Sequence, residues 1–556
     1  MKHPGYNMLK ITPLGGTREI GLNMTVIEYG DTAFAIDAGL MFPEGYMLGV
    51  DIVLPDMDYI REKGKNFAAV VLTHGHEDHI GAIPYLLRDM NVPIFGTPFT
   101  LGLVRHKLEE AGLLANARLH TISLDEFLRI GPFELDFMRV NHSVVDGVGM
   151  AIKTPVGTVV HSGDFKLSQS AFPWMNTDVD KFVWYGGQGI LALLSDSTNV
   201  EKDGRTISDM AVGETLEKII AKSPGRAIVA LFASNIVRIQ QIVDIAEKHN
   251  RKVIFDGRSI ETSTQIARDL DYLRLPDGIE MNIRQIDEVP DDEVVVITTG
   301  SQGEPMSSLA RMATGSNKMI KTRPGDTIIL SSKFIPGNER AITSIINHFY
   351  EQGADVVYEK ISDIHVSGHA FREELIEMMQ MVNPTYFIPV HGERRHLIHH
   401  ARLAKQAGIP EENIILPDNG LVIEFDETGV RTKDHITTGR VLVDGKGVGD
   451  VGSSVLRERK ELAEDGIVVV VIVFDEETGI VVHGPELLSR GFVFQNLKGH
   501  ILEDAQCVIL EILEEVRPDM PDRVSVIETQ MKSALRQYFK FTIKRRPVVI
   551  PVMIEV

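Results

Sequence analysis

The chain has 556 residues, of which 43% are hydrophobic and 24% charged, a composition typical of soluble globular proteins of about three or four domains. Its single cysteine, Cys507, excludes an intrachain disulfide and any zinc site built from several cysteines. The net charge of −21 argues against broad, non-specific coating of nucleic acid, although bound cations and a few arginines can still make one positive groove on an acidic body.

No segment of the sequence indicates secretion or insertion into a membrane. Residues Met1–Lys10 lack the apolar core of a signal peptide, and the longest apolar run, Ile467–Phe474, is far shorter than the roughly 18 residues of a membrane span. We therefore expect a cytoplasmic location and no membrane partner.

The first 206 residues predict strands and helices in alternation, which is typical of an α/β sandwich. Short strands are expected at Lys10–Pro13, Met24–Tyr29, Ala33–Asp37, Phe67–Leu72, Val92–Phe95, Pro132–Val140 and Gly157–His161. Helices are expected at Ile80–Arg88 and Leu101–Ala111.

A dense run of potential metal ligands follows the strand Phe67–Leu72. It reads His74-Gly-His76-Glu-Asp78-His79, so four ligands lie within six residues. Imidazole and carboxylate suit zinc or a similar divalent ion. A single histidine is more often a satisfied core or surface residue, but this packing after a strand favours metal. If other parts of the chain contribute further ligands, two ions would use all of them. Such a pair of ions activates water for attack on phosphorus.

Residues 207–362 predict a second, doubly wound domain of parallel strands and helices. Strands are expected at Arg226–Leu231, Val253–Phe255, Glu293–Thr298 and Thr327–Leu330, and helices at Met210–Lys222, Ile236–His249 and Arg340–Gln352. Ligand sites in such domains lie at the carboxyl ends of the strands.

Metal-type side chains return in residues 363–435. His365 and His369 lie close together, and His391 follows the expected strand Thr385–Val390. Earlier in the chain, His142 and Asp164 follow predicted strands in the same way. One polar residue after a strand is usually part of a turn, but loops at strand ends can converge on one site. The second domain therefore interrupts the first, and the chain returns to complete the site.

The remaining residues predict a linker and a small domain. Residues 436–465 are rich in glycine and charge, as linkers are, and residues 466–556 predict an α+β domain. Its strands are expected at Gly466–Phe474, Gly479–His483 and Pro547–Val556, and its helices at Leu497–Arg517 and Val524–Tyr538. An apolar helix face here does not distinguish self-association from packing within the chain.

These motifs, taken in order, resemble the metallo-β-lactamase superfamily, whose successive motifs are matched by Asp37, the run His74–His79, His142, Asp164 and His391. The insertion, together with Asp196 and His369, resembles the β-CASP group of nucleic-acid hydrolases within it. Further segments are similar to the bacterial ribonuclease J family over essentially the whole chain: Ala233–Asn235, Ser331–Ser332, Pro336–Glu339 and His365–His369.

That resemblance implies the architecture and the ligands. We expect a metallo-β-lactamase αββα sandwich formed by residues 1–206 and 363–435, an inserted doubly wound β-CASP domain of residues 207–362, the linker 436–465 and the small α+β C-terminal domain 466–556. Two divalent ions are implied, zinc being expected and manganese the alternative. The implied ligands are His74, His76 and His142 for one ion, Asp78, His79 and His391 for the other, and Asp164 for both. Asp37 would support the site without binding metal.

The resemblance also assigns catalytic and phosphate-binding residues. His369, oriented by Asp196, would be the acid that protonates the leaving 3′ oxygen, and Asp78 counts among the catalytic residues. Asp196 and His369 could instead be a structural pair at the domain joint. A pocket for a 5′-monophosphate or RNA is implied at Ser331, Ser332, Asn338, His365, Val366, Ser367, Gly368 and His369, where successive N–H groups could form an anion nest.

Basic residues give weaker indications of an RNA path. Arg238, Lys333 and Arg340 are candidates to line it, although such side chains are usually just solvated. Lys540, Lys544, Arg545 and Arg546 lie among Tyr538, Phe539 and Phe541, which could bind RNA by charge and stacking. We slightly prefer the interpretation that this cluster protects a strand edge.

The expected function is that of a metal-dependent ribonuclease on single-stranded RNA, with 5′→3′ exonuclease activity that prefers a 5′-monophosphate and with endonuclease activity. Such an enzyme would act in rRNA processing and mRNA decay, as a homodimer or homotetramer through the C-terminal domain and with partners in RNA-decay complexes. The alternatives are a DNA-acting β-CASP nuclease, a hydrolase of small thioesters or lactams, and a non-catalytic scaffold. The long insertion argues against a small substrate, and the complete ligand set argues against a scaffold. Residues alone do not separate RNA from DNA.

Overall fold

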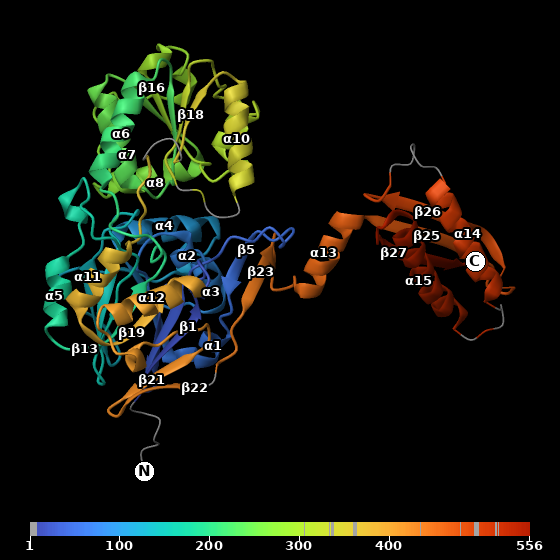
Figure 1. The fold of residues 1–556 in the computed structure, drawn as a ribbon, viewed down its shortest axis with the longest axis horizontal. Helices are drawn as coiled ribbons and strands as arrows, with labels where there is room; N and C mark the ends of the chain where they lie inside the picture. The colour runs from blue at the N-terminus through green and yellow to red at the C-terminus, as the bar shows by residue number, and fades with distance from the viewer. Residues whose placement is uncertain are drawn as a thin grey trace. The chain divides into compact units, whose positions relative to one another are not determined.

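The computed structural model describes residues 8–304, 306–332, 334, 338–359, 364–433, 435–478, 480–493, 500–516, 520 and 522–556. The chain divides into two compact units. The first comprises residues 1–42 and 52–441, and the second comprises residues 43–51 and 442–556. Figure 1 labels helices and strands in chain order.

An eight-stranded sheet forms one layer of the first unit. Its spatial order is β22 (Gly429–Lys433), β21 (Val422–Asp426), β1 (Leu9–Gly15), β3 (Met24–Tyr29), β4 (Thr32–Ile36), β6 (Phe67–Val71), β7 (Ile94–Gly96) and β8 (Leu119–Thr121). The strands from β4 to β8 run parallel, with Ile36 paired to Val71. The residues that follow β4 and β6 therefore meet at the same edge of the sheet.

A six-stranded sheet forms the facing layer. Its order is β19 (Pro384–Val390), β13 (Ile190–Asp196), β12 (Thr158–His161), β11 (Val148–Lys153), β10 (Phe133–Arg139) and β9 (Leu128–Ile130). Strands β12, β13 and β19 are parallel, and Asp196 pairs with Val390. Strand β19 comes from the part of the chain after the insertion, so the returning chain completes this sheet.

Helices cover both outer faces of this pair of sheets, while apolar side chains of both sheets fill the space between them. Helices α5 (Val179–Gly186), α11 (Arg372–Val382) and α12 (Arg394–Gln406) pack on the six-stranded sheet. Helices α1 (Asp58–Lys63) and α4 (Pro98–Glu110) pack on the other sheet, with α2 (Glu77–Ile80) and α3 (Ile83–Asp89) between them in the chain. This arrangement confirms the expected αββα sandwich.

The insertion folds as a five-stranded parallel sheet between two helical layers, seen in green and yellow in Figure 1. Its strand order is β15 (Lys252–Asp256), β16 (Val294–Thr298), β14 (Ala227–Ala230), β17 (Thr327–Leu330) and β18 (Asp355–Val357). One face packs on α6 (Asp209–Lys222), α7 (Ile236–Lys248) and α8 (Arg258–Asp269), and the other on α9 (Ser308–Ala313) and α10 (Glu339–Glu351). The expected doubly wound fold is thus confirmed.

The core of the insertion continues into the sandwich. Val144 and Val145, which follow His142 closely in the chain, are fully buried in the same apolar cluster as Ile236 and Leu231 of the insertion. Beside this cluster, the buried Lys166 of the sandwich donates to Asp209 of α6 at 2.9 Å. The two domains therefore share apolar packing next to a predicted metal ligand.

The second unit has a three-stranded sheet of order β26 (Val481–Arg490), β25 (Ile467–Phe474) and β27 (Val548–Glu555). One face packs on α14 (His500–Glu515) and α15 (Arg523–Ile543). The segment expected to be a linker carries regular structure, namely β23 (Arg440–Asp444), β24 (Gly447–Val448) and α13 (Ser453–Asp465). Helix α13 forms because good helix formers lie between Gly452 and Gly466, although it buries none of its side chains. Among the described helices, none has the length and apolar character needed to cross a membrane.

Candidate metal centre and active site

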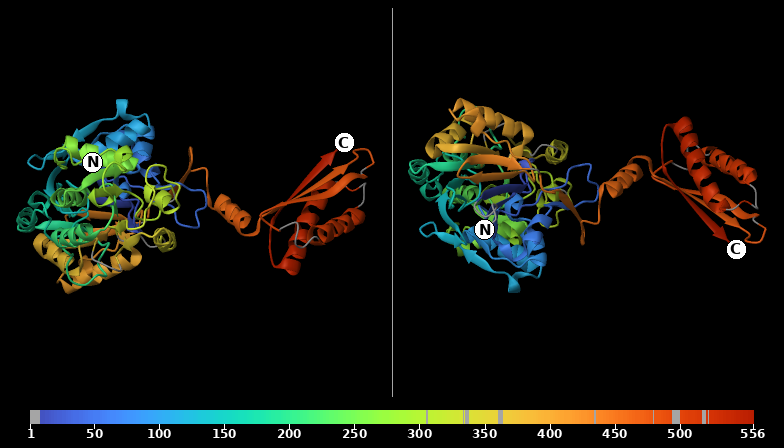
Figure 2. Two further views of the ribbon diagram at one scale, coloured as in Figure 1. Left: turned by 90° about the horizontal axis from the view of Figure 1, so that it is seen from above. Right: turned by 90° about the horizontal axis from the view of Figure 1, so that it is seen from below.

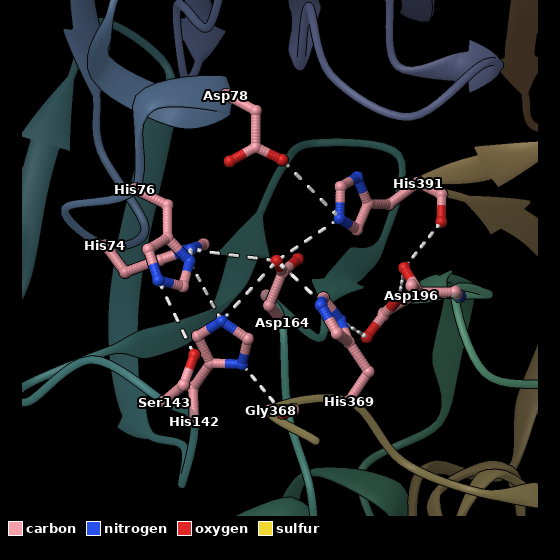
Figure 3. Close-up of polar contacts among 12 residues, drawn as sticks. His74, His76, Asp78, His142, Ser143, Asp164, Asp196, Gly368, His369 and His391 are labelled. Carbon is pink, nitrogen blue, oxygen red and sulfur yellow. Dashed lines mark hydrogen bonds and ion pairs between the residues drawn. The ribbon is translucent and has the colours of Figure 1, made fainter. Parts of the chain in front are cut away.

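All seven predicted metal ligands lie together at one edge of the two sheets, and Figure 3 labels each of them except His79. His74 follows β6, and His76, Asp78 and His79 lie at or in the first turn of α2. The other three follow strands of the six-stranded sheet: His142 follows β10, Asp164 follows β12 and His391 follows β19. The strand ends predicted from the sequence thus converge in space.

His74, His76 and His142 form a first ligand group with three converging nitrogens. The Nδ1 atom of His76 lies 3.0 Å from Nε2 of His74 and 3.1 Å from Nε2 of His142. Zinc ligands at about 2.0–2.1 Å in a tetrahedral arrangement have donor atoms about 3.3 Å apart, close to this spacing. Because Nδ1 of His142 donates to the carbonyl oxygen of Gly368 at 2.7 Å, its neutral ring keeps a lone pair on Nε2.

Burial keeps the rings of the first ligand group uncharged. Desolvation lowers the pKa of His74 and of His142 well below the usual imidazole value, and that of His76 to about 4. These three uncharged rings bring ring nitrogens to within 3.0–3.1 Å of one another. A cation is the partner that this donor set fits, because metals bind the neutral imidazole.

Asp78, His79 and His391 form a second ligand group. Oδ2 of Asp78 lies 3.6 Å from Nε2 of His79 and 3.9 Å from Nε2 of His391. The outer nitrogens are occupied, since Nδ1 of His79 lies 2.8 Å from Asp37 and Nδ1 of His391 lies 2.9 Å from Oδ1 of Asn23. Burial acts to lower the pKa of His79, but the carboxylates of Asp164, Asp78 and Asp37 outweigh burial and raise this pKa well above the usual value. This surplus of negative charge also fits a bound cation.

Asp164 lies between the two ligand groups. Its Oδ2 atom is 3.6 Å from Nε2 of His74 in the first group, and 3.2 Å and 3.3 Å from Nε2 of His79 and of His391 in the second. Burial alone would raise the pKa of Asp164, but the surrounding imidazoles hold it well below its usual value. One carboxylate facing both groups suits a ligand shared by two ions.

Asp37 holds the second ligand group from outside, as expected of a supporting residue. Its carboxylate accepts from the backbone N–H and the hydroxyl of Thr73, both at 2.8 Å, as well as contacting His79. Such contacts fix the orientation of a ligating imidazole. Asp37 follows β4 with φ 62°, and its side chain is 2% exposed.

His369 and Asp196 form a close pair beside the ligand groups (Figure 3). Nδ1 of His369 lies 2.8 Å from Oδ2 of Asp196 and 3.9 Å from Oδ2 of Asp164. Burial acts to lower the pKa of His369, but the Asp196 carboxylate outweighs it and raises the pKa to about 9. The imidazole is therefore protonated at neutral pH and next to the predicted metal ligands.

The predicted phosphate pocket is only partly described. The hydroxyl of Ser331 donates to the carbonyl oxygen of Ile364 at 2.6 Å, and that of Ser332 accepts from Gln302 at 2.8 Å, so both hydroxyls have partners within the protein. Val366 points into the apolar core, where it is 5% exposed. Asn338 precedes α10, whereas Pro336 and Gly337 of its motif lie outside the described residues. Residues 364–371, here named the return loop, carry the other predicted pocket residues: His365, Ser367, Gly368 and His369.

The basic candidates have different surroundings from those expected. Arg238 is 2% exposed and lies 3.5 Å from Asp209, so it is a core residue and not part of an open RNA path. Arg340 is exposed on α10, and Lys333 lies outside the described residues. Part of the C-terminal cluster lies on a helix, and the rest directly precedes the edge strand β27. Helix α15 extends to Ile543 and so takes in Lys540 and the exposed Phe541, while Phe539 is buried in the core.

Several residues at the site carried no sequence signal. Asn23 contacts both His391 and the backbone of Asp78, and Thr73 contacts Asp37. Thr198 and Asn199 follow Asp196 and contact the surrounding loops. Each is a common polar residue in a turn or at a strand end, and each has a partner that is distant in the sequence. The position of Thr198 and Asn199 within three residues of the predicted Asp196 was a hint.

Family models match this chain in four consecutive regions. Residues 18–205 match the metallo-beta-lactamase superfamily, and residues 224–349 match the beta-CASP domain of ribonuclease J. Residues 353–417 match the RNA specificity domain of Zn-dependent metallo-hydrolases, and residues 454–556 match the ribonuclease J C-terminal domain.

Full-length relatives show the same likeness. The chain is 38% identical to ribonuclease J2 of Bacillus subtilis, with 100% of both chains covered. It is 40% identical to ribonuclease J of Thermus thermophilus, with 98% of this chain and 95% of the relative covered. A solved structure of a protein of unknown function from Enterococcus faecalis has a TM-score of 0.53 at 16% identity, covering 75% of this chain and 100% of that one, a likeness of fold alone.

Proposed function

The chain belongs to the ribonuclease J family of metallohydrolases, and from this premise we propose that it degrades single-stranded RNA from the 5′ end and also cuts internally. The observation that carries the proposal is the convergence of seven ligand side chains beside a protonated His369. It is a ribonuclease that uses divalent metal, as its family and its ligand clusters indicate. The preference for one end, the balance of the two activities and the mechanism are our proposals.

We propose that the first ligand group holds one ion, the second holds another, and Asp164 binds both. Bound divalent ions activate water and stabilise charge on the phosphate during in-line displacement. The protein's own part is to keep the histidines of the first ligand group neutral by burial and to fix ligand rings through outer hydrogen bonds to acceptors such as Asp37 and the carbonyl oxygen of Gly368. Zinc is the proposed ion and manganese the alternative, since both accept nitrogen and oxygen ligands.

His369 is the proposed acid that protonates the leaving 3′ oxygen. Its Nδ1 proton is held by Asp196, so the Nε2 proton of the imidazolium is the one available for transfer. Ionised Asp196 favours the protonated ring, as the raised pKa of about 9 reflects. After transfer, the neutral ring would regain a proton from water before the next cleavage.

We propose that the return loop recognises a 5′-monophosphate. Ser367 and Gly368 are small residues that permit close approach of a phosphate to backbone N–H groups. The loop is fixed to the first ligand group through Gly368 and to Asp196 through His369. A terminal phosphate bound there would therefore lie at a set distance from the proposed ions. That spacing would release one nucleotide at a time.

The wider role follows from the same premise. We propose action in the cytoplasm, in rRNA processing and mRNA decay, with RNA-decay proteins as partners. Self-association through the C-terminal domain is supported by the sheet face opposite α14 and α15. There Val469 pairs with Leu488 and Ile550, which are 47% and 41% exposed, and Val473 pairs with Ile554, which is 43% exposed. An open apolar face of this kind is typical of a protein interface.

The test is cleavage of one internally labelled RNA that carries either a 5′-monophosphate or a 5′-triphosphate. We expect rapid release of mononucleotides from the monophosphate form. His76→Ala should abolish cleavage, whereas His348→Ala, on the exposed side of α10, should not. Equal internal cutting of both forms would reject the phosphate pocket but keep the metal-dependent nuclease. Cleavage of single-stranded DNA at the same rate would favour the DNA-acting alternative, and no cleavage of either would reject the proposal.

A further inference from the structure

Two uncharged residues, Thr198 and Asn199, link the proposed acid to the second ligand group. They lie in the turn that follows Asp196 at the end of β13, and this turn passes between His391 and the return loop. Asn199 is 7% exposed, and neither residue is a candidate ligand. Their contacts show what they hold in place.

Thr198 fixes the Asp196 carboxylate. Its backbone N–H donates to Oδ1 of Asp196 at 2.9 Å, and its hydroxyl donates to the same oxygen at 2.8 Å. The hydroxyl oxygen also lies 3.1 Å from the carbonyl oxygen of His391. With Oδ1 held by two donors, the carboxylate cannot rotate freely, and Oδ2 stays directed at Nδ1 of His369.

Asn199 fixes the backbone that carries His369. Its side-chain amide donates to the carbonyl oxygen of His369 at 3.1 Å and to the hydroxyl of Ser367. The carbonyl oxygen of Gly368, between them, accepts from His142. Three consecutive residues of the return loop are therefore each held by a side chain from outside the loop.

We infer that Thr198 and Asn199 are positioning residues that together aim the His369 imidazole, Thr198 through the Asp196 carboxylate and Asn199 through the loop backbone. The inference rests on the proposed role of His369 as the acid. An acid that transfers a proton in the transition state must be held within a few tenths of an ångström and some degrees of its working geometry. Loss of the Thr198 support would then slow the chemical step while leaving RNA binding and metal content intact.

The sharpest test uses Thr198, because the chain allows matched variants there. Thr198→Val keeps the shape and removes the hydroxyl, and Thr198→Ser keeps the hydroxyl. Supporting hydrogen bonds around metal ligands are commonly worth 10–100-fold in activity, so we expect Thr198→Val to lower kcat by about tenfold. KM for the RNA should stay within about twofold, and Thr198→Ser should retain most of the activity. Thr215→Val on α6, where the hydroxyl contacts only its own helix, is the matched control.

A second readout does not depend on cleavage. In zinc-loaded, 15N-histidine-labelled protein, the proton that Nδ1 of His369 shares with Asp196 should give a downfield resonance, assigned by its loss in His369→Ala. We expect Thr198→Val to shift or broaden it, and Asn199→Leu to do the same. Thermal unfolding and bound metal are measured for each variant, and Thr198→Ala replaces valine if that variant does not fold.

An unchanged kcat and an unchanged resonance in Thr198→Val would overturn the inference. So would equal impairment of Thr198→Ser and Thr198→Val, because Thr198→Ser keeps the hydroxyl and the loss of activity would then not come from the loss of its hydrogen bonds. Failure of the wild-type protein to cleave RNA would reject the proposed function instead. In that case the resonance alone would still decide whether Thr198 and Asn199 position His369.

Discussion

His142 donates a hydrogen bond from Nδ1 to the carbonyl oxygen of Gly368, at 2.7 Å and across 226 positions of sequence. This contact joins the first ligand group to the return loop. The approach is close enough that a Cβ atom on Gly368 would lie 2.5 Å from Cε1 of His142 and 2.8 Å from the hydroxyl of Ser143. The proposed metal site and the loop that carries the proposed acid are therefore packed as one assembly.

Gly368→Ala should disturb both parts at once. The added methyl group cannot be accommodated unless the His142 ring or the loop shifts, because contacts under 3.0 Å are repulsive. We expect loss of bound metal from the first ligand group and loss of RNA cleavage, measured by elemental analysis and by the RNA assay. Gly45→Ala is the control, since nothing lies within 4 Å of a Cβ there. Full metal content and activity in Gly368→Ala would contradict the close packing.

Asp37→Ala should weaken the second ion without removing any ligand. The variant frees Nδ1 of His79 and leaves the N–H of Thr73 without its acceptor. Removal of an outer carboxylate commonly costs about 10–100-fold in metal affinity, so we expect a loss in that range for one of two ions. Titration against a competing chelator measures it. Asp58→Ala, at an exposed helix start, should bind metal as the wild type does.

Asp146 should make stability depend on pH at the joint between the sandwich and the insertion. It accepts from Thr97, from the N–H of Phe99 and from Tyr272 of the insertion. Burial raises the pKa of Asp146 to about 6, above its unfolded value of 3.8. The folded state therefore prefers the protonated form, and stability falls as pH rises from about 4 to about 6, by up to about 3 kcal/mol.

The comparison is with Asp146→Asn, which cannot ionise. Urea unfolding in the presence of a chelator removes the pH dependence of metal binding from both proteins. The free energy of unfolding of the wild type, taken relative to the variant, should fall between pH 4 and pH 6 and level off above. A constant difference over this range would show that the carboxyl group titrates alike in both states.

The open face of the C-terminal sheet should carry self-association. Leu488→Glu places a charge in the middle of this face, which an apolar interface would exclude. We expect a shift to a smaller species in light scattering after size-exclusion chromatography. Leu510→Glu is the control, because Leu510 is 45% exposed, close to the 47% of Leu488, but lies on helix α14 and not on this face. If both variants keep the oligomeric state of the wild type, the face does not mediate assembly.

Much of the site could be predicted because its ligands are dense in the sequence and follow strands. His142, Asp164 and His391 could be predicted to meet because each follows an expected strand, whereas Asp196 was implied only by the resemblance; the parallel order of β12, β13 and β19 explains why Asp164, Asp196 and His391 lie at one edge. Arg238 could not be placed, because only tertiary packing brings its guanidinium to a buried Asp209. Helix α13 was not predicted because its glycine-rich flanks resemble those of a linker. The last turn of α15 was not predicted because basic residues at the end of a helix resemble the charged residues of a strand edge.

Strand β19 and His391 follow the insertion in the chain, although they finish a sheet that begins before it. Any polypeptide that stops before residue 384, through a nonsense codon or incomplete synthesis, lacks one member of the second ligand group and the edge strand beside Asp196. Such fragments can contain the whole His74–His79 run and still have an incomplete centre. During synthesis, His391 is therefore added only after every residue of the insertion has been made.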